Sequence, residues 1–178
     1  MKVLIISDTH GKSSCLKQIH DIVGDVEMLI HLGDVEGDEK LIHDLFDCEI
    51  HMVRGNCDYN PELPIYDEFN IGDKRAFITH GHRYGVNSGI SYLEELIDTE
   101  GYDFVMYGHT HRRDLTSYKG SYIVNPGSLA LPRDNRIGTY MLLDFDQHGT
   151  PFFAENELSN IDTPEEKKRK SFLEDLWG

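Results

Sequence analysis

The chain has 178 residues, of which 39% are hydrophobic and 28% are charged. This length and composition are typical of one globular domain with its own apolar core. The formal net charge of −15 at pH 7 argues against a protein that holds nucleic acid through clustered lysines and arginines. Cys15, Cys48 and Cys57 show no paired spacing, which favours free thiols and predicts a cytoplasmic location. No apolar run approaches the roughly 18 residues of a membrane span, so no membrane partner is predicted.

The first third of the chain predicts alternating strands and helices. Short apolar runs at residues 3–6, 26–32 and 48–53 are typical of strands buried on both faces of a sheet. Between them, residues 13–23 and 38–46 place apolar side chains at helical spacing. This order predicts a mostly parallel sheet with right-handed crossovers.

The remainder of the chain predicts a second sheet. Residues 65–71 and 75–79 are expected to form an antiparallel hairpin about Gly72-Asp73, and residues 88–99 a helix. Further strands are predicted at 104–107, 115–118, 122–124, 139–145 and 152–158. The fold class predicted is therefore α/β, with two packed mixed sheets flanked by helices.

The last residues differ in character. We expect a domain over residues 1–160 and a helical tail over 161–178. Thr163-Pro164-Glu165-Glu166 has the chemistry of a helix start, and Trp177 belongs to an apolar face beyond it. Two interpretations stay open: the helix docks on its own domain, or it binds a partner.

Seven side chains of the metal-ligand type directly follow predicted strands. They are Asp8, His10, Asp34, Asn56, His80, His109 and His111. In open α/β sheets, functional sites form at this edge. The spacings Asp8-x-His10 and His109-x-His111 place alternate side chains on one side of an extended stretch, so that each pair can reach one cation.

The chemistry of this set predicts which ions it holds. Carboxylate, amide and imidazole ligands without thiolate suit Mn, Fe, Zn, Co or Ni better than Ca or Mg. Seven ligands exceed the needs of one tetrahedral ion and indicate two divalent metal ions about 3.5–4 Å apart, with Mn²⁺ as the leading candidate. A single Gly-Asp or Gly-Asn pair usually marks only a turn, so the prediction depends on the coincidence of all seven at one edge.

Five blocks of sequence resemble the signature of the calcineurin-like metallophosphoesterases. They are Asp8-x-His10, Gly33-Asp34, Gly55-Asn56, His80 and Gly108-His109-Thr110-His111. Asn125-Pro126-Gly127-Ser128 also resembles a block of the small, single-domain bacterial and archaeal phosphodiesterases. The resemblance implies a four-layer α/β/β/α sandwich with two metal ions. It implies one ion on Asp8, His10, Asp34 and His111, and the other on Asp34, Asn56, His80 and His109.

The same resemblance implies an activity, namely hydrolysis of a small phosphodiester, including nucleotide-derived ones, by attack of a metal-bridging hydroxide. Asp34, Asn56 and His82 are the residues predicted to take part in catalysis. Many members of the family have a histidine after the Gly-Asn pair, where this chain has Cys57. Because a thiol is a poor acid for an alkoxide, His82 is the candidate acid, and diesters with good leaving groups are favoured. The sequence shows no base paired with Cys57, so Cys57 is not predicted to act as a nucleophile.

Two other functions compete with this prediction. The retromer scaffold subunit has the same fold, so one alternative is a non-catalytic, metal-binding scaffold for protein interaction. A nuclease is the other, and the acidic charge argues against it. Short hairpins in the C-terminal half are candidates for pairing in a homo-oligomer. Loop arginines are candidate contacts for a second phosphate oxygen, although an ordinary surface role is the simpler interpretation: Arg54, Arg83, Arg112 and Arg133.

Overall fold

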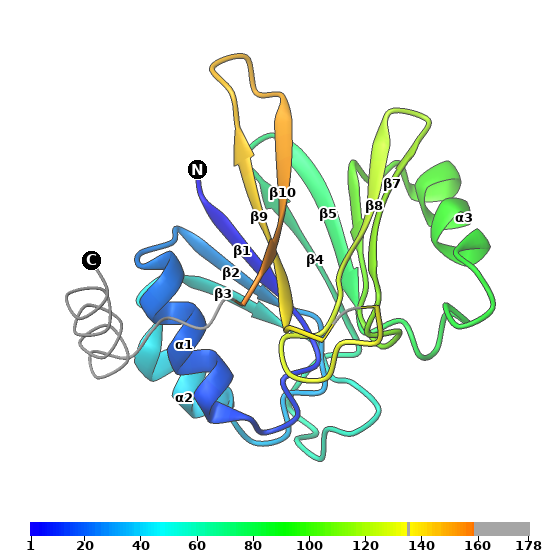
Figure 1. Ribbon diagram of the computed structural model, residues 1–178. Coiled ribbons are helices and arrows are strands. Elements are labelled where there is room, and N and C mark those ends of the chain that lie inside the picture. Colours follow the sequence, from blue (N-terminus) through cyan, green and yellow to red (C-terminus); the bar gives the residue numbers. More distant parts are fainter. Residues whose placement is uncertain (135, 159–178) are drawn as a thin grey trace, which may run out of the picture.

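Two five-stranded mixed sheets form the centre of the computed structural model, which describes residues 1–134 and 136–158 (Figure 1). The first sheet has the order β10-β9-β1-β2-β3 and the second β4-β5-β6-β8-β7. The predicted tail at 161–178 lies outside the described residues. Helices cover the outer face of each sheet, so the predicted α/β/β/α class is confirmed.

The elements follow the predicted order along the chain. The first sheet contains β1 (Val3–Ile6), β2 (Met28–His31), β3 (Glu49–Met52), β9 (Thr139–Phe145) and β10 (Pro151–Glu157). The second contains β4 (Tyr66–Ile71), β5 (Lys74–Thr79), β6 (Phe104–Met106), β7 (Arg113–Tyr118) and β8 (Ser121–Pro126). The helices are α1 (Ser13–Val23), α2 (Glu39–Leu45) and α3 (Ser91–Glu100). The third helix therefore begins at Ser91 and not at residue 88.

The burial of β1 explains why its sequence shows no alternation. Val3 and Ile5 pack between the two sheets, while Leu4 and Ile6 pack against α1 and α2. Successive strand residues point to opposite faces, and here both faces are covered. All four side chains are fully buried, and each such side chain contributes about 1.5–3 kcal/mol through the hydrophobic effect. The third helix covers the second sheet through its own apolar cluster around Leu93.

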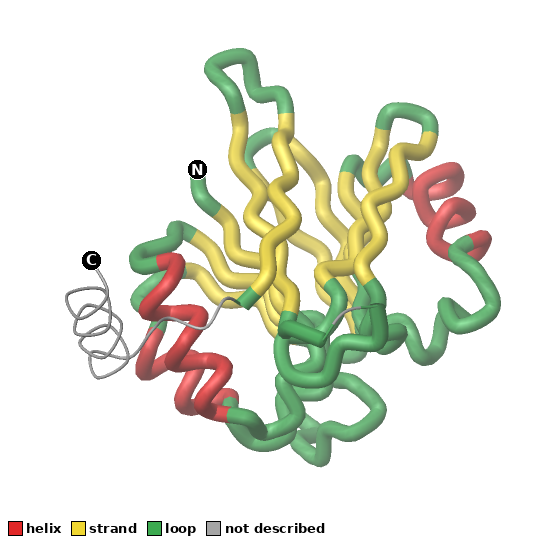
Figure 2. The backbone as a smooth tube through the Cα atoms, viewed as in Figure 1, coloured by secondary structure: helices red, strands yellow, loops and turns green. Residues whose placement is uncertain are grey.

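Parallel pairing brings the loops of the candidate site together. The strands β1, β2 and β3 pair in parallel, and so do β5 and β6. Their carboxyl ends, and the loops that follow them, lie at one end of the two packed sheets (Figure 2). The described part of the chain has no helix that is long and apolar enough to cross a bilayer.

Candidate metal centre

Two buried carboxylates form the middle of the candidate site. Asp8 Oδ1 lies 3.1 Å from Nε2 of His111, 3.9 Å from Nε2 of His10 and 4.0 Å from Nε2 of His80. Asp34 Oδ2 lies 3.4 Å from Nε2 of His80 and 3.9 Å from Nε2 of His10. Loops that are far apart in the sequence thus deliver these five predicted ligands to one cluster.

The other two predicted ligands border this cluster. Asn56 Oδ1 lies 3.2 Å from Nε2 of His80. The ring of His109 stands 5.2 Å from the ring of His80, measured between centroids. Its Nε2 accepts a hydrogen bond from Nδ2 of Asn87 at 2.9 Å. His109 therefore lies next to the cluster, with one ring nitrogen already engaged.

Three imidazoles are held in the tautomer that metal binding requires. The Nδ1–H of His10 donates to Glu36 Oε1 at 2.7 Å, and the Nδ1–H of His80 donates to the carbonyl of Leu32 at 2.6 Å. The Nδ1–H of His111 likewise donates to a backbone carbonyl, that of residue 131, at 2.7 Å. Each ring therefore directs its Nε2 atom, the nitrogen that would bind a metal ion, toward the carboxylates. Such hydrogen bonds orient and strengthen histidine ligands in metal sites.

One direct observation indicates that the predicted ligands suit a cation. Asp8 Oδ1 is buried and has no hydrogen-bond partner among residues 1–134 and 136–158, whereas Asp8 Oδ2 accepts hydrogen bonds from Ser7 Oγ and the His109 N–H. A buried, unpartnered carboxylate oxygen is costly. The Nε2 atoms of His10 and His111 also lie only 3.3 Å apart. Lone pairs this close are stabilised by a positive charge between them, and a cation bound there would supply it.

The pKa shifts describe a site that stabilises positive charge. Burial lowers the pKa of His80, but Asp34 and Asp8 outweigh it and raise the pKa above its ordinary value. Burial lowers the pKa of His111 as well, but Asp8 outweighs this effect and raises the pKa above its ordinary value. Burial raises the pKa of Asp34, but the neighbouring His80 and the Cys57 N–H hold it well below the usual range. By contrast, burial and His80 lower the pKa of His109.

The backbone conformation at the predicted ligands differs from the expected one. The Asp-x-His and His-x-His segments were expected to be extended, but the structure places their outer residues in the left-handed region. Positive φ angles of 49–67° occur at Asp8, His10, Asp34, His109 and His111. The side chains of Asp8 and His10 still approach each other, with Oδ1 and Nε2 3.9 Å apart. Non-glycine residues rarely adopt this conformation, and such strain concentrates at functional sites.

Glycines allow the loops to approach each other closely. A β-carbon at Gly55 would lie 2.0 Å from Asp34 Oδ1 and 2.4 Å from Asp34 N, and one at Gly108 would lie 2.1 Å from Ser7 Oγ. Neither contact is possible with a side chain. The Gly-Asn and Gly-His pairs therefore bring one loop against the carboxylate of another.

Several residues that position the site carry no sequence pattern. Asp58 accepts hydrogen bonds from the N–H groups of Asp34, Glu36 and Gly55, which holds the second and third blocks together. His31 is buried between two of the loops; its Nε2 lies 3.0 Å from Thr9 Oγ1, and its Nδ1 accepts from the backbone at 3.2 Å. Only the pairing of loops in three dimensions reveals these roles.

The block that begins at Asn125 contacts two of the loops that form the site. Nδ2 of Asn125 donates to the carbonyl of Gly108 at 3.0 Å. The hydroxyl of Ser128 donates to the carbonyl of Asp8 at 2.8 Å. Both side chains therefore support the loops that bear the predicted ligands.

The position after the Gly-Asn pair contains a thiol that stays protonated. Burial, followed by the charge of Asp34, raises the pKa of Cys57 to about 12. Its sulfur accepts a hydrogen bond from Nδ2 of Asn56 at 3.2 Å. The ring of His82 lies 5.4 Å from that of His80, and its buried Nδ1 has no hydrogen-bond partner within the described part of the chain. Burial lowers the pKa of His82.

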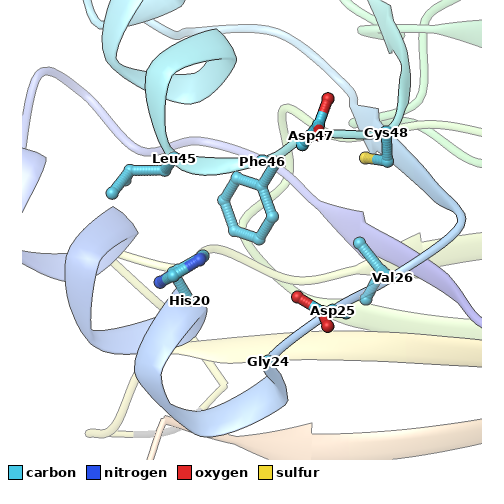
Figure 3. Close-up of a pocket in the computed structure, with 8 residues that line it drawn as sticks. All are labelled: His20, Gly24, Asp25, Val26, Leu45, Phe46, Asp47 and Cys48. Atoms are coloured by element: carbon cyan, nitrogen blue, oxygen red, sulfur yellow. The ribbon is translucent and has the colours of Figure 1, made fainter.

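A separate cavity of about 320 Å³ lies at the other end of the first sheet (Figure 3). It is lined by the ends of α1 and α2, including His20, Phe46 and Asp47. The ring of His20 packs edge-on against Phe46. Because the predicted ligands follow the opposite ends of the strands, this cavity is remote from the candidate metal centre.

The chain belongs to the calcineurin-like phosphoesterase superfamily, whose domain profile matches residues 1–148. It is 31% identical over 168 residues to the probable metallophosphoesterase YsnB of Bacillus subtilis, covering 90% of this chain and 96% of that protein. A phosphodiesterase of Methanocaldococcus jannaschii is 33% identical over 145 residues, which cover 71% of this chain and 83% of that protein. The predicted family is therefore confirmed.

A structural neighbour shows how widely the fold is shared. The crystal structure of Entamoeba histolytica Vps29 complexed with zinc superposes with a TM-score of 0.70 at 22% identity, covering 89% of this chain and 100% of that one. At this identity the likeness concerns the fold alone. It does not favour the scaffold alternative, and the candidate ligand clusters in this chain agree with the enzymatic family.

Substitution of Gly55 by alanine tests the close approach of the loops. The added β-carbon must displace Asp34, so Gly55→Ala is expected to weaken Mn²⁺ binding by about 10- to 100-fold, as changes to supporting residues of metal sites do. Calorimetric titration of metal-free protein measures this. Gly24→Ala, whose β-carbon meets nothing within 4 Å, is the control and should keep the wild-type affinity. Equal affinity in Gly55→Ala would contradict the expected displacement.

The buried imidazole of His31 predicts a dependence of stability on pH. Burial lowers the pKa of His31 from 6.5 to about 4. Below about pH 6.5 the unfolded chain binds a proton that the folded chain refuses until about pH 4, so the free energy of unfolding falls as the pH decreases through this window. The full effect is about 3 kcal/mol.

Urea unfolding of protein kept in a chelator checks this prediction. Between pH 7 and pH 5, the loss of unfolding free energy should be about 2 kcal/mol smaller in His31→Gln than in the wild type. His148→Gln, at an exposed turn, is the matched control and should behave like the wild type. The same loss in His31→Gln would exclude His31 as its source.

Proposed function

We propose that this protein is a metal-dependent phosphodiesterase that hydrolyses small phosphodiesters with two divalent metal ions. The observation that carries the proposal is the buried, unpartnered Oδ1 of Asp8, which faces the Nε2 atoms of two histidines, His111 at 3.1 Å and His10 at 3.9 Å. The family supports a phosphoesterase, and relatives named phosphodiesterases support diesters as substrates.

The proposed ligand sets divide the cluster into two. Asp8, His10, Asp34 and His111 would hold one ion. Asp34, Asn56, His80 and His109 would hold the other, with Asp34 shared. The position of Asp34 Oδ2, within 3.9 Å of the Nε2 atoms of both His10 and His80, supports the sharing. Mn²⁺ remains the leading candidate, and a cytoplasmic location and a homo-oligomer stay predictions.

When bound, divalent cations make a water molecule nucleophilic near neutral pH and offset negative charge on the phosphoryl group. The protein's own contribution is to hold the carboxylates and imidazoles in fixed positions where they would bind the two ions. Asn56, which is exposed beside the cluster, is also proposed to take part in catalysis. As water adds to phosphorus and releases a proton to the solvent, the bond from phosphorus to the leaving oxygen breaks, and that oxygen takes up a proton. His82 is the proposed donor of this proton.

The presence of a thiol at Cys57 favours diesters with good leaving groups as substrates. With a pKa of about 12, the thiol is a weak acid for a departing alkoxide. Leaving groups that are stable as anions need no acid, so the absence of a histidine at this position costs them little.

Hydrolysis of a chromogenic diester tests the proposed function. Protein reconstituted with Mn²⁺ should hydrolyse bis(p-nitrophenyl) phosphate, lose this activity in a chelator and regain it when Mn²⁺ is restored. Parallel assays with monoesters and cyclic nucleotides define the substrate range. A metal-loaded protein that hydrolyses neither the diester nor the monoesters nor the cyclic nucleotides would contradict the proposal.

Replacement of Asp34 by asparagine tests the shared ligand. Asn keeps the shape but loses the charge, so Asp34→Asn is expected to bind fewer than two equivalents of metal after dialysis, since one carboxylate serves both ions. Elemental analysis of the dialysed protein measures this. Asp73→Asn, at the exposed hairpin turn, should retain the wild-type content. Two full equivalents in Asp34→Asn would refute the sharing.

Removal of His82 tests the proton donor. His82→Ala should keep both metals but lose about 10²-fold or more in rate on diphenyl phosphate, whose leaving group needs a proton. The loss on bis(p-nitrophenyl) phosphate should be much smaller. An equal loss on the two diesters, or none, would remove His82 from this role.

A further inference from the structure

A cavity of about 380 Å³ lies beside the candidate metal centre. Asn87 lines it, and its Nδ2 donates to Nε2 of His109 at 2.9 Å. Thr110 also lines it, between the two histidines of the last ligand block. Arg133, a third lining residue, donates its backbone N–H to the carbonyl of His111 at 2.9 Å. The cavity therefore shares a wall with the proposed metal centre.

Three arginines line this cavity, and two of them carry uncompensated charge. Arg113 pairs with Asp134 at 3.1 Å and lies near two glutamates of β10. Arg112 and Arg133 form no ion pair with any residue in 1–134 or 136–158, and both are exposed. The chain contains 32 acidic residues against 17 basic ones, and these two exposed guanidinium groups lie in one cavity beside the proposed metal centre.

The hydrogen bonds of the acidic residue in the lining go to hydroxyl groups and not to these arginines. The carboxylate of Asp114 accepts hydrogen bonds from the hydroxyl of Tyr107 at 2.9 Å and from that of Thr116 at 2.8 Å. Arg112 and Arg133 thus remain available to a ligand. Guanidinium groups bind phosphate through paired, charge-assisted hydrogen bonds.

We infer that this cavity binds a second phosphate of the substrate, beside the phosphodiester that is hydrolysed. The inference rests on the proposed function and adds the substrate class: diesters that carry another phosphate, as phosphorylated nucleotide derivatives do. A terminal phosphate carries a charge of about −1.5 to −2 at pH 7, which two guanidinium groups match. The volume lies at the small end of ligand pockets, while Val86 and Ile90 add an apolar surface for the group that links the phosphates.

Binding of mono- and bisphosphates tests this inference without depending on turnover. The Mn²⁺-reconstituted protein should bind thymidine 3′,5′-bisphosphate about 10- to 100-fold more tightly than either thymidine monophosphate, as measured by calorimetry. In the double variant Arg112→Ala/Arg133→Ala, the ratio of the affinity for the bisphosphate to that for a monophosphate should fall to within about twofold of one. Arg112→Gln/Arg133→Gln, which keeps longer side chains, should give the same result if the alanine variant does not fold.

The control removes the same charge elsewhere. Lys17→Ala/Lys40→Ala changes exposed residues of α1 and α2 and should retain the wild-type ratio. A wild-type ratio near one, or a ratio that survives in both arginine variants, would overturn the inference. Failure of the chromogenic diester assay concerns the proposed function alone. Hydrolysis of that diester with no preference for the bisphosphate would reject only the second phosphate site.

Discussion

The buried carboxylate of Asp8 is the group on which the arrangement of the site depends. One oxygen is satisfied by Ser7 and by the backbone of His109, and the other has no hydrogen-bond partner in the described chain. Three imidazoles direct Nε2 lone pairs at this carboxylate or at Asp34. A cluster of lone pairs without donors is unstable by itself. It becomes favourable when positive charge is placed among the ligands, and this need explains why loops from both sheets converge here.

The fold provides this convergence through parallel strands and close loop contacts. Rigid, fully buried strands such as β1 and β2 fix where each loop begins. The loops then adopt left-handed backbone conformations that non-glycine residues rarely occupy. The surrounding hydrogen bonds, above all those accepted by Asp58, hold the strained segments in place.

Sequence alone predicted the order of strands and helices, and it predicted that carboxylates and imidazoles follow the strand ends that meet at the candidate site, because apolar runs and residue types are local signals. It missed residues whose role exists only in three dimensions. His31 follows no pattern, yet it joins two loops from inside the core. The expectation of an extended Asp8-x-His10 segment was wrong, since periodicity describes strands and not the tight loops that follow them. The engagement of His109 by Asn87 also depends on a contact between loops distant in sequence.

The charge distribution links the metal centre to the choice of substrate. An acidic surface repels a long polyanion over its whole length, whereas a small anion needs only a local region of positive potential. Bound cations would create that region at the carboxylate cluster, because an ion's own charge dominates its surroundings. Arg112 and Arg133 would extend it into the neighbouring cavity. A substrate with two separate phosphates fits both halves of this region, while the remaining surface of the acidic chain disfavours larger nucleic acids.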